Sequence, residues 1–317
     1  MSIKNKNLFT YKPTVVTFAI ITAITWAFAF PLIKIGFEAF QIEALDTGAK
    51  TLFAGIRFFL AGVLTLLIAK TSKCSFKLGN GENIALLVIF SIINTTLHYF
   101  FFYIGLSNLS GSRSAIIDSL STFILIILAC IVSKNEHFTI KKFLGCLLGF
   151  TGILLININV GNEDIPAFSL LGDGMLFMSA LSSAIGGILT RIVTKKINPM
   201  VATGVSLALG GLLLIITGVI MGGKLMVITP FGIFILLMLV LVSAVGFSLY
   251  NKLISCNPVG EIAIFNSFIP IFGAILSCLI LKEPFYFEYF TSALFVICGV
   301  YIINKPVKKN TDKGINN

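Results

Sequence analysis

The sequence predicts an all-α integral membrane protein in which ten transmembrane helices form two inverted five-helix repeats. Three observations predict this fold class: the composition, a succession of ten apolar runs, and an internal repeat. Of the 317 residues, 57% are hydrophobic and only 11% are charged, and the mean hydropathy is +1.01. These values lie outside the range of soluble globular domains, so the expected environment of the chain is a lipid bilayer.

Each apolar run is long enough to cross a bilayer, because a spanning helix needs roughly 20 mostly apolar residues. The runs leave short tails at residues 1–14 and 305–317 and no room for a soluble domain. The first run continues past Trp26, so we expect an uncleaved first helix and not a signal peptide. The predicted helices cover residues 15–36, 51–69, 84–105, 113–133, 140–158, 171–193, 199–221, 231–250, 260–281 and 287–304.

The connections between the runs give an orientation. Most Lys and Arg residues outside the runs fall on the side of the N-terminus, whereas the first connection on the other side carries Glu38, Glu43 and Asp46. Since basic loops favour the cytoplasm, we expect both termini to be cytoplasmic and the host membrane to be the cell membrane. These lysines account for the net charge of +10, so we expect no nucleic-acid partner.

The chain contains an internal repeat. Residues 100–157 align with residues 247–304 without a gap, and both copies share an E-x-F-x4-F pattern followed by a G-x3-I-N helix end. We therefore predict two repeats, residues 15–158 and 171–304. Each has five helices, an odd number, so the second must enter the membrane from the opposite face. Inverted repeats of this kind are the architecture of many secondary transporters.

Several stretches carry a family resemblance. Residues 258–266, 270–276 and 281–283 are similar to the ninth helix of the EamA type of the drug/metabolite transporter superfamily, and residues 26–34 and the pair Arg57-Phe58 are similar to its first two helices. The resemblance covers nearly the whole chain. It implies a ten-helix fold of two EamA repeats, and export or exchange of small metabolites such as amino acids.

The fourth predicted helix departs from this family pattern. It has Phe123 where the ninth helix has Pro270, and it carries Asp118 where the family has small or apolar residues. Details of the family's fourth helix are therefore not transferred to this chain.

Three ionisable residues lie deep within predicted helices. Burying such a group in a bilayer costs about 2.5–3.5 kcal/mol, so it usually faces a cavity or a partner. At 1.5 Å per residue, Arg57, His98 and Asp118 all lie roughly 9–12 Å below the outer surface, and we expect them to meet. Three roles are open: a structural ion pair between Arg57 and Asp118, a site for a substrate carboxylate, and a proton relay through His98.

The first helix has one distinctive face. Thr22, Trp26, Phe30 and Lys34 recur every four residues and therefore share one side of the helix. Trp26, the only Trp, lies too deep for an interfacial aromatic belt, so we expect the face to line a substrate pathway. Lys34 either belongs to this pathway or extends to the membrane interface.

The second half offers further candidates. Tyr250 ends the eighth predicted helix, and Asn266 and Pro270 lie along one turn of the ninth, where proline can free a backbone carbonyl near the midplane. We expect these residues to contact substrate; ordinary interhelical hydrogen bonding is the alternative for Tyr250 and Asn266. The small-residue face of Gly145, Gly149 and Gly152 favours close helix packing or a homodimer contact.

These features favour a carrier. We find no H-E-x-x-H, no paired carboxylates at membrane depth and no G-x4-G-K-[ST], so we expect no enzyme, no resident metal or cofactor and no direct ATP drive. Rings of charged residues, which would indicate a channel, are also missing. The leading hypothesis is a secondary transporter that exports small polar metabolites. The alternatives are drug efflux and import or exchange of a larger, nucleotide-sugar-like metabolite; a doubly anionic phosphate would need more deep Arg or Lys residues.

Overall fold

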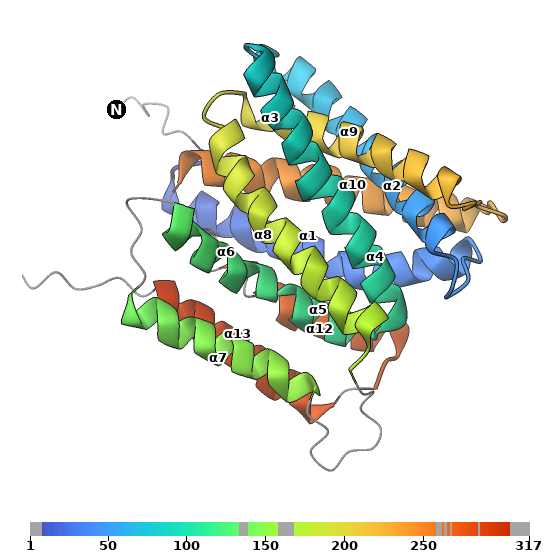
Figure 1. The fold of residues 1–317 in the computed structure, drawn as a ribbon, viewed down its shortest axis with the longest axis vertical. Coiled ribbons are helices and arrows are strands. Elements are labelled where there is room, and N and C mark those ends of the chain that lie inside the picture. Colours follow the sequence, from blue (N-terminus) through green and yellow to red (C-terminus); the bar gives the residue numbers. More distant parts are fainter. Residues whose placement is uncertain are drawn as a thin grey trace, which may run out of the picture.

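The computed structural model describes residues 8–132, 139–157, 168–257, 262, 265–266, 268–284 and 286–304. Every regular element in this part of the chain is a helix, which confirms the all-α class (Figure 1). Within the same residues, seven segments are long and apolar enough to cross a membrane: Lys12–Ala39, Thr47–Thr71, Gly81–Asn108, Gly111–Val132, Leu170–Val193, Pro199–Ile220 and Pro230–Cys256. Phe268–Leu281 and Phe287–Gly299 are shorter apolar helices.

Helices occupy each of the predicted apolar runs, but two of the runs are interrupted. The first half holds α1 (Lys12–Ala39), α2 (Thr47–Thr71), α3 (Gly81–Ser91), η1 (Ile92–Leu97), α4 (His98–Asn108), α5 (Gly111–Asp118), α6 (Leu120–Val132) and α7 (Ile140–Asn157). The second half holds η2 (Leu170–Gly174), α8 (Met175–Val193), α9 (Pro199–Ile220), α10 (Pro230–Cys256), α12 (Phe268–Leu281) and α13 (Phe287–Asn304). The π-helical turn η1 interrupts the predicted helix 84–105, and Ser119 separates α5 from α6 within the predicted helix 113–133.

Local sequence signals explain where several helices begin. The side chain of Asp46 accepts a hydrogen bond from the backbone N–H of Ala49 at the start of α2. Asn198 and Thr229 cap α9 and α10 in the same way, and each is followed by proline at the first helical position. Both features satisfy or remove backbone donors that have no partner within the helix.

Two helix pairs lie at opposite edges of the bundle. α2 packs along α9 at one edge, and α7 packs along α13 at the other (Figure 1). Glycines permit the close approach, since a Cβ added to Gly62 would lie 2.2 Å from the backbone nitrogen of Ala208, and one added to Gly299 would lie 2.4 Å from the carbonyl oxygen of Gly145. The predicted small-residue face of α7 is therefore used for packing within the chain.

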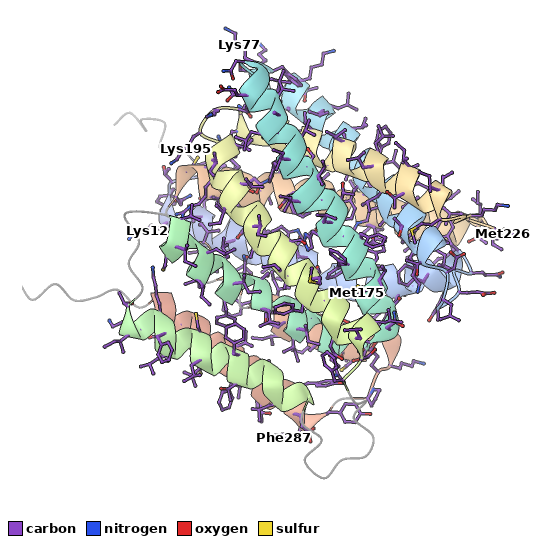
Figure 2. The ribbon with its side chains drawn as sticks, viewed as in Figure 1. Lys12, Lys77, Met175, Lys195, Met226 and Phe287 are labelled. Atoms are coloured by element: carbon purple, nitrogen blue, oxygen red, sulfur yellow. The ribbon has the colours of Figure 1, made fainter. Side chains whose placement is uncertain are left out.

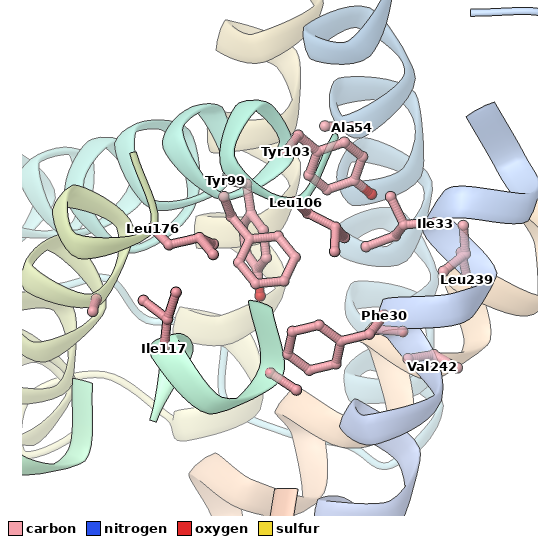
Figure 3. Packing of buried hydrophobic residues seen from close by; sticks show 14 of the residues in the cluster. Phe30, Ile33, Ala54, Tyr99, Tyr103, Leu106, Ile117, Leu176, Leu239 and Val242 are labelled. Atoms are coloured by element: carbon pink, nitrogen blue, oxygen red, sulfur yellow. The ribbon is translucent and has the colours of Figure 1, made fainter. Parts of the chain in front are cut away.

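The largest buried cluster joins the two halves near the centre of the bundle. Phe30 and Ile33 of α1 pack with Tyr99, Tyr103 and Leu106 of α4 (Figure 3). Large apolar side chains also cover the outside of the helices, as they do in proteins that face lipid. Examples that are more than half exposed are Leu67, Phe234, Leu237, Leu279 and Phe287.

The two ends of the bundle differ in character. Lys12, Lys77 and Lys195 lie at one end, and Met175, Met226 and Phe287 lie at the other (Figure 2). We call these the lysine end and the Glu283 end, the latter after the residue between α12 and α13 that organises it. Which end faces the cytoplasm stays a prediction from the loop charges.

Candidate functional site

A cavity of about 240 Å³ lies inside the bundle and is lined by both halves of the chain. Residues of α1, α2, α4, α5 and α6 meet residues of α8, α10 and α12 around it. The cavity extends toward the lysine end, where Lys142 of α7 and Arg191 of α8 line it. Toward the Glu283 end it stops at Ile33 and Ala115, both fully buried.

The structure brings together most of the candidate residues named from the sequence. The cavity lining includes Trp26, Phe30, Arg57, His98, Asp118, Tyr250, Asn266 and Pro270. Thr22 and Lys34 do not line it, and the position of Lys34 is described below. Within the described residues, no group of three or more His, Cys, Asp or Glu side chains lies together as a metal site would require.

Arg57 is held by hydrogen bonds to neutral groups. Its side chain is buried, with Nε 2.9 Å from Ser243 Oγ and 3.2 Å from the carbonyl oxygen of Leu239. Its Nη1 donates to the hydroxyl of Tyr103 at 2.9 Å. Arg57 therefore links α2 to α4 and α10.

The structural ion pair between Arg57 and Asp118, one of the three roles that the sequence left open, is not among the salt bridges of the described residues. The salt bridges given by the described residues are Lys34–Glu283 and Arg113–Asp173. The guanidinium of Arg57 faces Tyr103 and α10, whereas Asp118 ends α5 on another wall of the cavity. The prediction rested on equal depth, and depth alone does not fix the direction in which a side chain points around its helix.

One carboxylate oxygen of Asp118 has no protein partner in the part of the chain that the structure describes. Its Oδ1 is buried and accepts no hydrogen bond from the described residues. The hydroxyl of Ser121 donates to the backbone carbonyl of Asp118 at 2.8 Å and leaves the side chain untouched. Oδ1 of Asp118 is thus a hydrogen-bond acceptor left unengaged at the cavity wall.

His98 is positioned by its own helix. Its Nδ1 lies 3.3 Å from the carbonyl oxygen of Asn94, one turn earlier, and its ring stacks on Tyr99 with centroids 4.2 Å apart. Asn94 belongs to the π-helical turn η1 and also lines the cavity. Such turns are frequent at functional sites. The polar stretch Asn94-Thr-Thr96 within an apolar run is the sequence signal that could have indicated it.

Aromatic rings form much of the cavity wall. Trp26 lies 4.8 Å from Tyr250 and 5.2 Å from Phe247 between ring centroids. Phe30 lies 5.5 Å from Phe102. Sequence analysis missed Tyr99, Phe102 and Phe247, although Tyr99 and Phe102 fall in the aromatic run that follows His98.

Tyr250 and Asn266 join α10 to the segment before α12. The side-chain amide of Asn266 donates to the hydroxyl of Tyr250 at 2.8 Å. This is the interhelical hydrogen bond that the sequence left open as an alternative to substrate contact. Both residues line the cavity as well, next to Pro270, so the bond and a contact with substrate are compatible.

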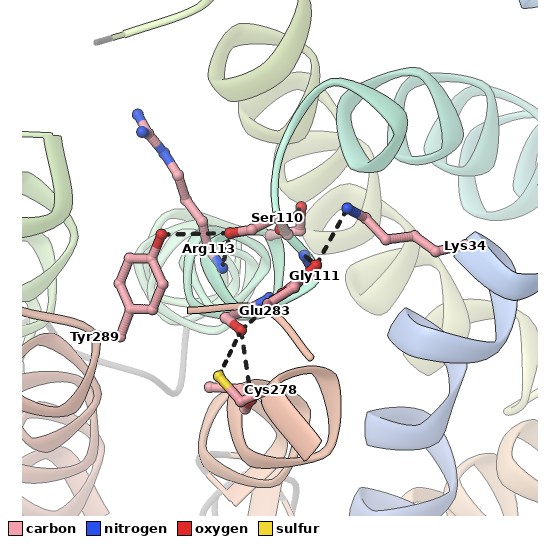
Figure 4. Close-up of polar contacts among 10 residues, drawn as sticks. Lys34, Ser110, Gly111, Arg113, Cys278, Glu283 and Tyr289 are labelled. Carbon is pink, nitrogen blue, oxygen red and sulfur yellow. Dashed lines mark hydrogen bonds and ion pairs between the residues drawn. The ribbon is translucent and has the colours of Figure 1, made fainter. Parts of the chain in front are cut away.

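Lys34 lies outside the cavity, at the Glu283 end. Its Nζ is 3.2 Å from Oε1 of Glu283, and the two side chains are 23% and 11% exposed (Figure 4). The same carboxylate accepts hydrogen bonds from the backbone N–H of Gly111 at 2.8 Å and of Ser112 at 3.1 Å, at the start of α5. Of the two positions that the sequence left open for Lys34, the partly exposed ion pair with Glu283 lies nearer to the interfacial one, and Lys34 does not line the cavity with Trp26 and Phe30.

Comparisons with known proteins agree with these features. The model of the EamA-like transporter family matches residues 13–158 and 170–305. Similar proteins include two uncharacterized transporters of Bacillus subtilis (strain 168). YvbV is 26% identical over 301 residues, 92% of this chain and 93% of YvbV. YetK is 25% identical over 256 residues, 79% of this chain and 77% of YetK.

A plant protein and a solved structure extend the comparison. The chloroplastic WAT1-related protein At3g02690 of Arabidopsis thaliana is 28% identical over 274 residues, 83% of this chain and 65% of that protein. A protein of known crystal structure shares the fold, with a TM-score of 0.67 and 11% identity over 90% of this chain and 95% of its own. The family match spans most of the chain and confirms the resemblance found in the sequence. The protein is therefore a multi-pass membrane transporter of the EamA-like transporter family, within the drug/metabolite transporter superfamily.

Proposed function

We propose that this protein is a secondary transporter that exports small polar metabolites such as amino acids, by alternating access of two inverted five-helix repeats. One observation carries the proposal. A central cavity is lined by described residues of both halves, extends toward the lysine end and stops short of the Glu283 end. A carrier that alternates between two conformations has, in each of them, a cavity that is open toward one side of the membrane and closed toward the other.

The pattern of helix contacts supports two related halves. In the repeat alignment α4 corresponds to α10, the α5–α6 segment to α12, and α7 to α13. α1 packs against α10 and α12, and α8, which begins the second half, packs against α4 and α6. The counterparts α2 and α9 contact each other, as do α7 and α13. Reciprocal contacts of this kind are expected when a two-fold axis in the membrane plane relates two copies.

Cavity size and charge favour a small zwitterion. A volume of about 240 Å³ falls below the roughly 300–1,000 Å³ of pockets for drug-sized ligands, so a nucleotide-sugar is the poorer fit. Arg57 and Asp118 bring one charge of each sign to the lining at depth. A doubly anionic phosphate would require a surplus of positive charge there.

The direction follows from the charge of the two ends. If the lysine end faces the cytoplasm, as basic loops favour, the cavity takes up substrate from the cytoplasm in this state. Release on the other side requires the Lys34–Glu283 end to open. A cycle that loads from the cytoplasm and releases outside is export.

The experiment has two stages. A panel of amino acids, nucleosides and amines is tested for thermal stabilisation of the detergent-purified protein, and the compounds that stabilise it are then followed as fluxes in proteoliposomes. We expect saturable flux that Asn266→Ala reduces, because Asn266 lines the cavity. Thr17→Ala serves as the control, since Thr17 is exposed and bonds only to its own helix. Flux that rises linearly with concentration, or no flux of any stabilising compound, would contradict a carrier.

A further inference from the structure

We infer that Asp118 binds the ammonium group of the transported molecule while the surrounding aromatic rings hold its apolar part, so that the substrates are amines or amino acids with an apolar side chain. This inference deepens the proposed transport function and rests on it. It begins from a contrast between the two deep ionisable residues of the cavity. Nε and Nη1 of Arg57 are engaged by three protein acceptors, whereas Oδ1 of Asp118 is buried and engaged by none of the described residues.

A buried carboxylate needs a counter-charge. Removing an ion from water costs several kcal/mol unless a partner of opposite sign and hydrogen bonds replace the water. Among the cationic residues that line the cavity, Arg57 is directed to Tyr103 and α10, and Lys142 and Arg191 belong to its lysine end. The protein therefore provides the site for a cation at Asp118, and a substrate ammonium is a group that fits it.

The local backbone at Asp118 also favours a positively charged ligand. Asp118 is the last residue of α5, and Ser119 interrupts the helix before α6 begins. The carbonyl groups at the end of a helix carry partial negative charge, and interrupted helices in transporters present such ends to cations. The carboxylate thus lies at the partially negative end of α5, where neighbouring serines already donate to the carbonyl groups of Ile116 and Asp118.

The aromatic wall selects an organic cation over a metal ion. Trp26, Phe30, Tyr99 and Phe247 line the same cavity as Asp118. Ring faces attract ammonium groups and bury hydrocarbon, but they provide no oxygen ligands for a metal ion. No second Asp or Glu of the described residues lines the cavity, so a divalent cation would find a single carboxylate there.

The single tryptophan of the chain provides a fluorescent probe of binding. Trp26 is the only tryptophan in the sequence and lies in the cavity wall, so its fluorescence reports on this site alone. We would titrate the purified protein with three probes of similar shape: phenethylamine (cation), phenylalanine (zwitterion) and 3-phenylpropionate (anion). The first two are expected to change the emission of Trp26, and 3-phenylpropionate is expected to bind at least about tenfold more weakly.

Substitution of Asp118 is the decisive test. Asp118→Asn is expected to weaken phenethylamine binding by about 30-fold or more, because a buried charge pair is lost, and to leave 3-phenylpropionate unchanged. Glu82→Gln is the matched control, since it neutralises a carboxylate at an exposed position outside the cavity. Asp118→Glu, which keeps the charge, covers the case in which the asparagine variant does not fold, and it should preserve the preference for the cation.

The outcomes separate the two proposals. Equal phenethylamine affinity in the wild type and in Asp118→Asn overturns the ammonium site, and so does a wild type that binds 3-phenylpropionate as well as phenethylamine. Absence of any response to all three probes, in both fluorescence and thermal stability, also overturns it. Transport of other compounds would survive each of these results. Conversely, cation-selective binding without flux in proteoliposomes would sustain the site and refute the carrier.

Discussion

Lys34 of α1 and Glu283, in the link between α12 and α13, form an ion pair with 3.2 Å between Nζ and Oε1. Glu283 also accepts the backbone N–H groups of Gly111 and Ser112 and the hydroxyl of Ser112. One carboxylate thus ties α1, the start of α5 and the α12–α13 link together. These contacts join the two halves of the chain at the end where the cavity is closed (Figure 4).

Glu283→Gln should loosen this end. The partly exposed ion pair contributes about 1 kcal/mol, so its loss should raise the population of an open Glu283 end about fivefold. Cys278 reports on this opening, since its Sγ lies 3.3 Å from Ser112 Oγ. In a variant whose only cysteine is Cys278, we expect an impermeant maleimide to react about fivefold faster. Glu288→Gln removes the same charge nearby and should leave the rate unchanged; equal rates in all three proteins would show that Glu283 does not hold this end closed.

Substitution of Arg57 should lower the stability of the protein more than substitution of one of its neutral hydrogen-bond partners. Arg57→Lys removes a planar group that reaches Leu239, Ser243 and Tyr103 at once, and a lysine ammonium cannot bond in those directions simultaneously. We expect the free energy of unfolding to fall by about 2–4 kcal/mol, against about 1 kcal/mol for Tyr103→Phe. Reversible unfolding in mixed detergent, followed by helical circular dichroism, measures both. A lysine variant no less stable than Tyr103→Phe would contradict this role.

The helices and the cavity residues could be predicted from sequence because both depend on the bilayer. Long apolar runs leave few alternatives to a helix, and the polar or charged groups inside them must face inward. That reasoning placed Arg57, His98, Asp118 and Asn266 correctly on one cavity. This inference uses only the position of each polar residue within its own apolar run and does not depend on its tertiary contacts.

The pairing of those residues could not be predicted in the same way. Arg57 and Asp118 share a depth, but Arg57 finds its acceptors on α10, far away in sequence. Lys34 finds Glu283 for the same reason. The π-helical turn η1 includes the polar stretch Asn94-Thr-Thr96, but a polar stretch in an apolar run does not by itself specify a π-helical turn. Tertiary contacts decide each of these features.

Gly246→Ala should displace the indole of Trp26. A Cβ at position 246 would lie 2.5 Å from Nε1 of Trp26, a distance that forces the ring to move. Because Trp26 stacks near Tyr250 and Phe247, we expect a shifted emission maximum and weaker binding of any compound that occupies the cavity. Val245→Ala, at the exposed neighbouring position of α10, should leave the spectrum as it is. An unchanged emission spectrum in Gly246→Ala would mean that the indole does not lie against α10.

Gly62→Ala should separate α2 from α9. The added Cβ would lie 2.2 Å from the backbone nitrogen of Ala208, and a backbone cannot move aside as a flexible side chain can. We expect overpacking to lower the free energy of unfolding by about 1–3 kcal/mol. Gly81→Ala is the control, because a Cβ at that position meets nothing within 4 Å.

A second substitution across the same interface tests whether the two helices act as one packed pair. A Cβ on Gly211 of α9 would lie 2.3 Å from the backbone nitrogen of Phe59 on α2. Once Gly62→Ala has moved the helices apart, adding Gly211→Ala should lower the free energy of unfolding by less than Gly211→Ala does in the wild type. The reason is that the effects of neighbouring substitutions that share a backbone shift are not additive. The double variant, unfolded under the same conditions as the single ones, measures this coupling. Strict additivity would indicate that the two glycines allow two independent close contacts and that α2 and α9 do not move as a unit.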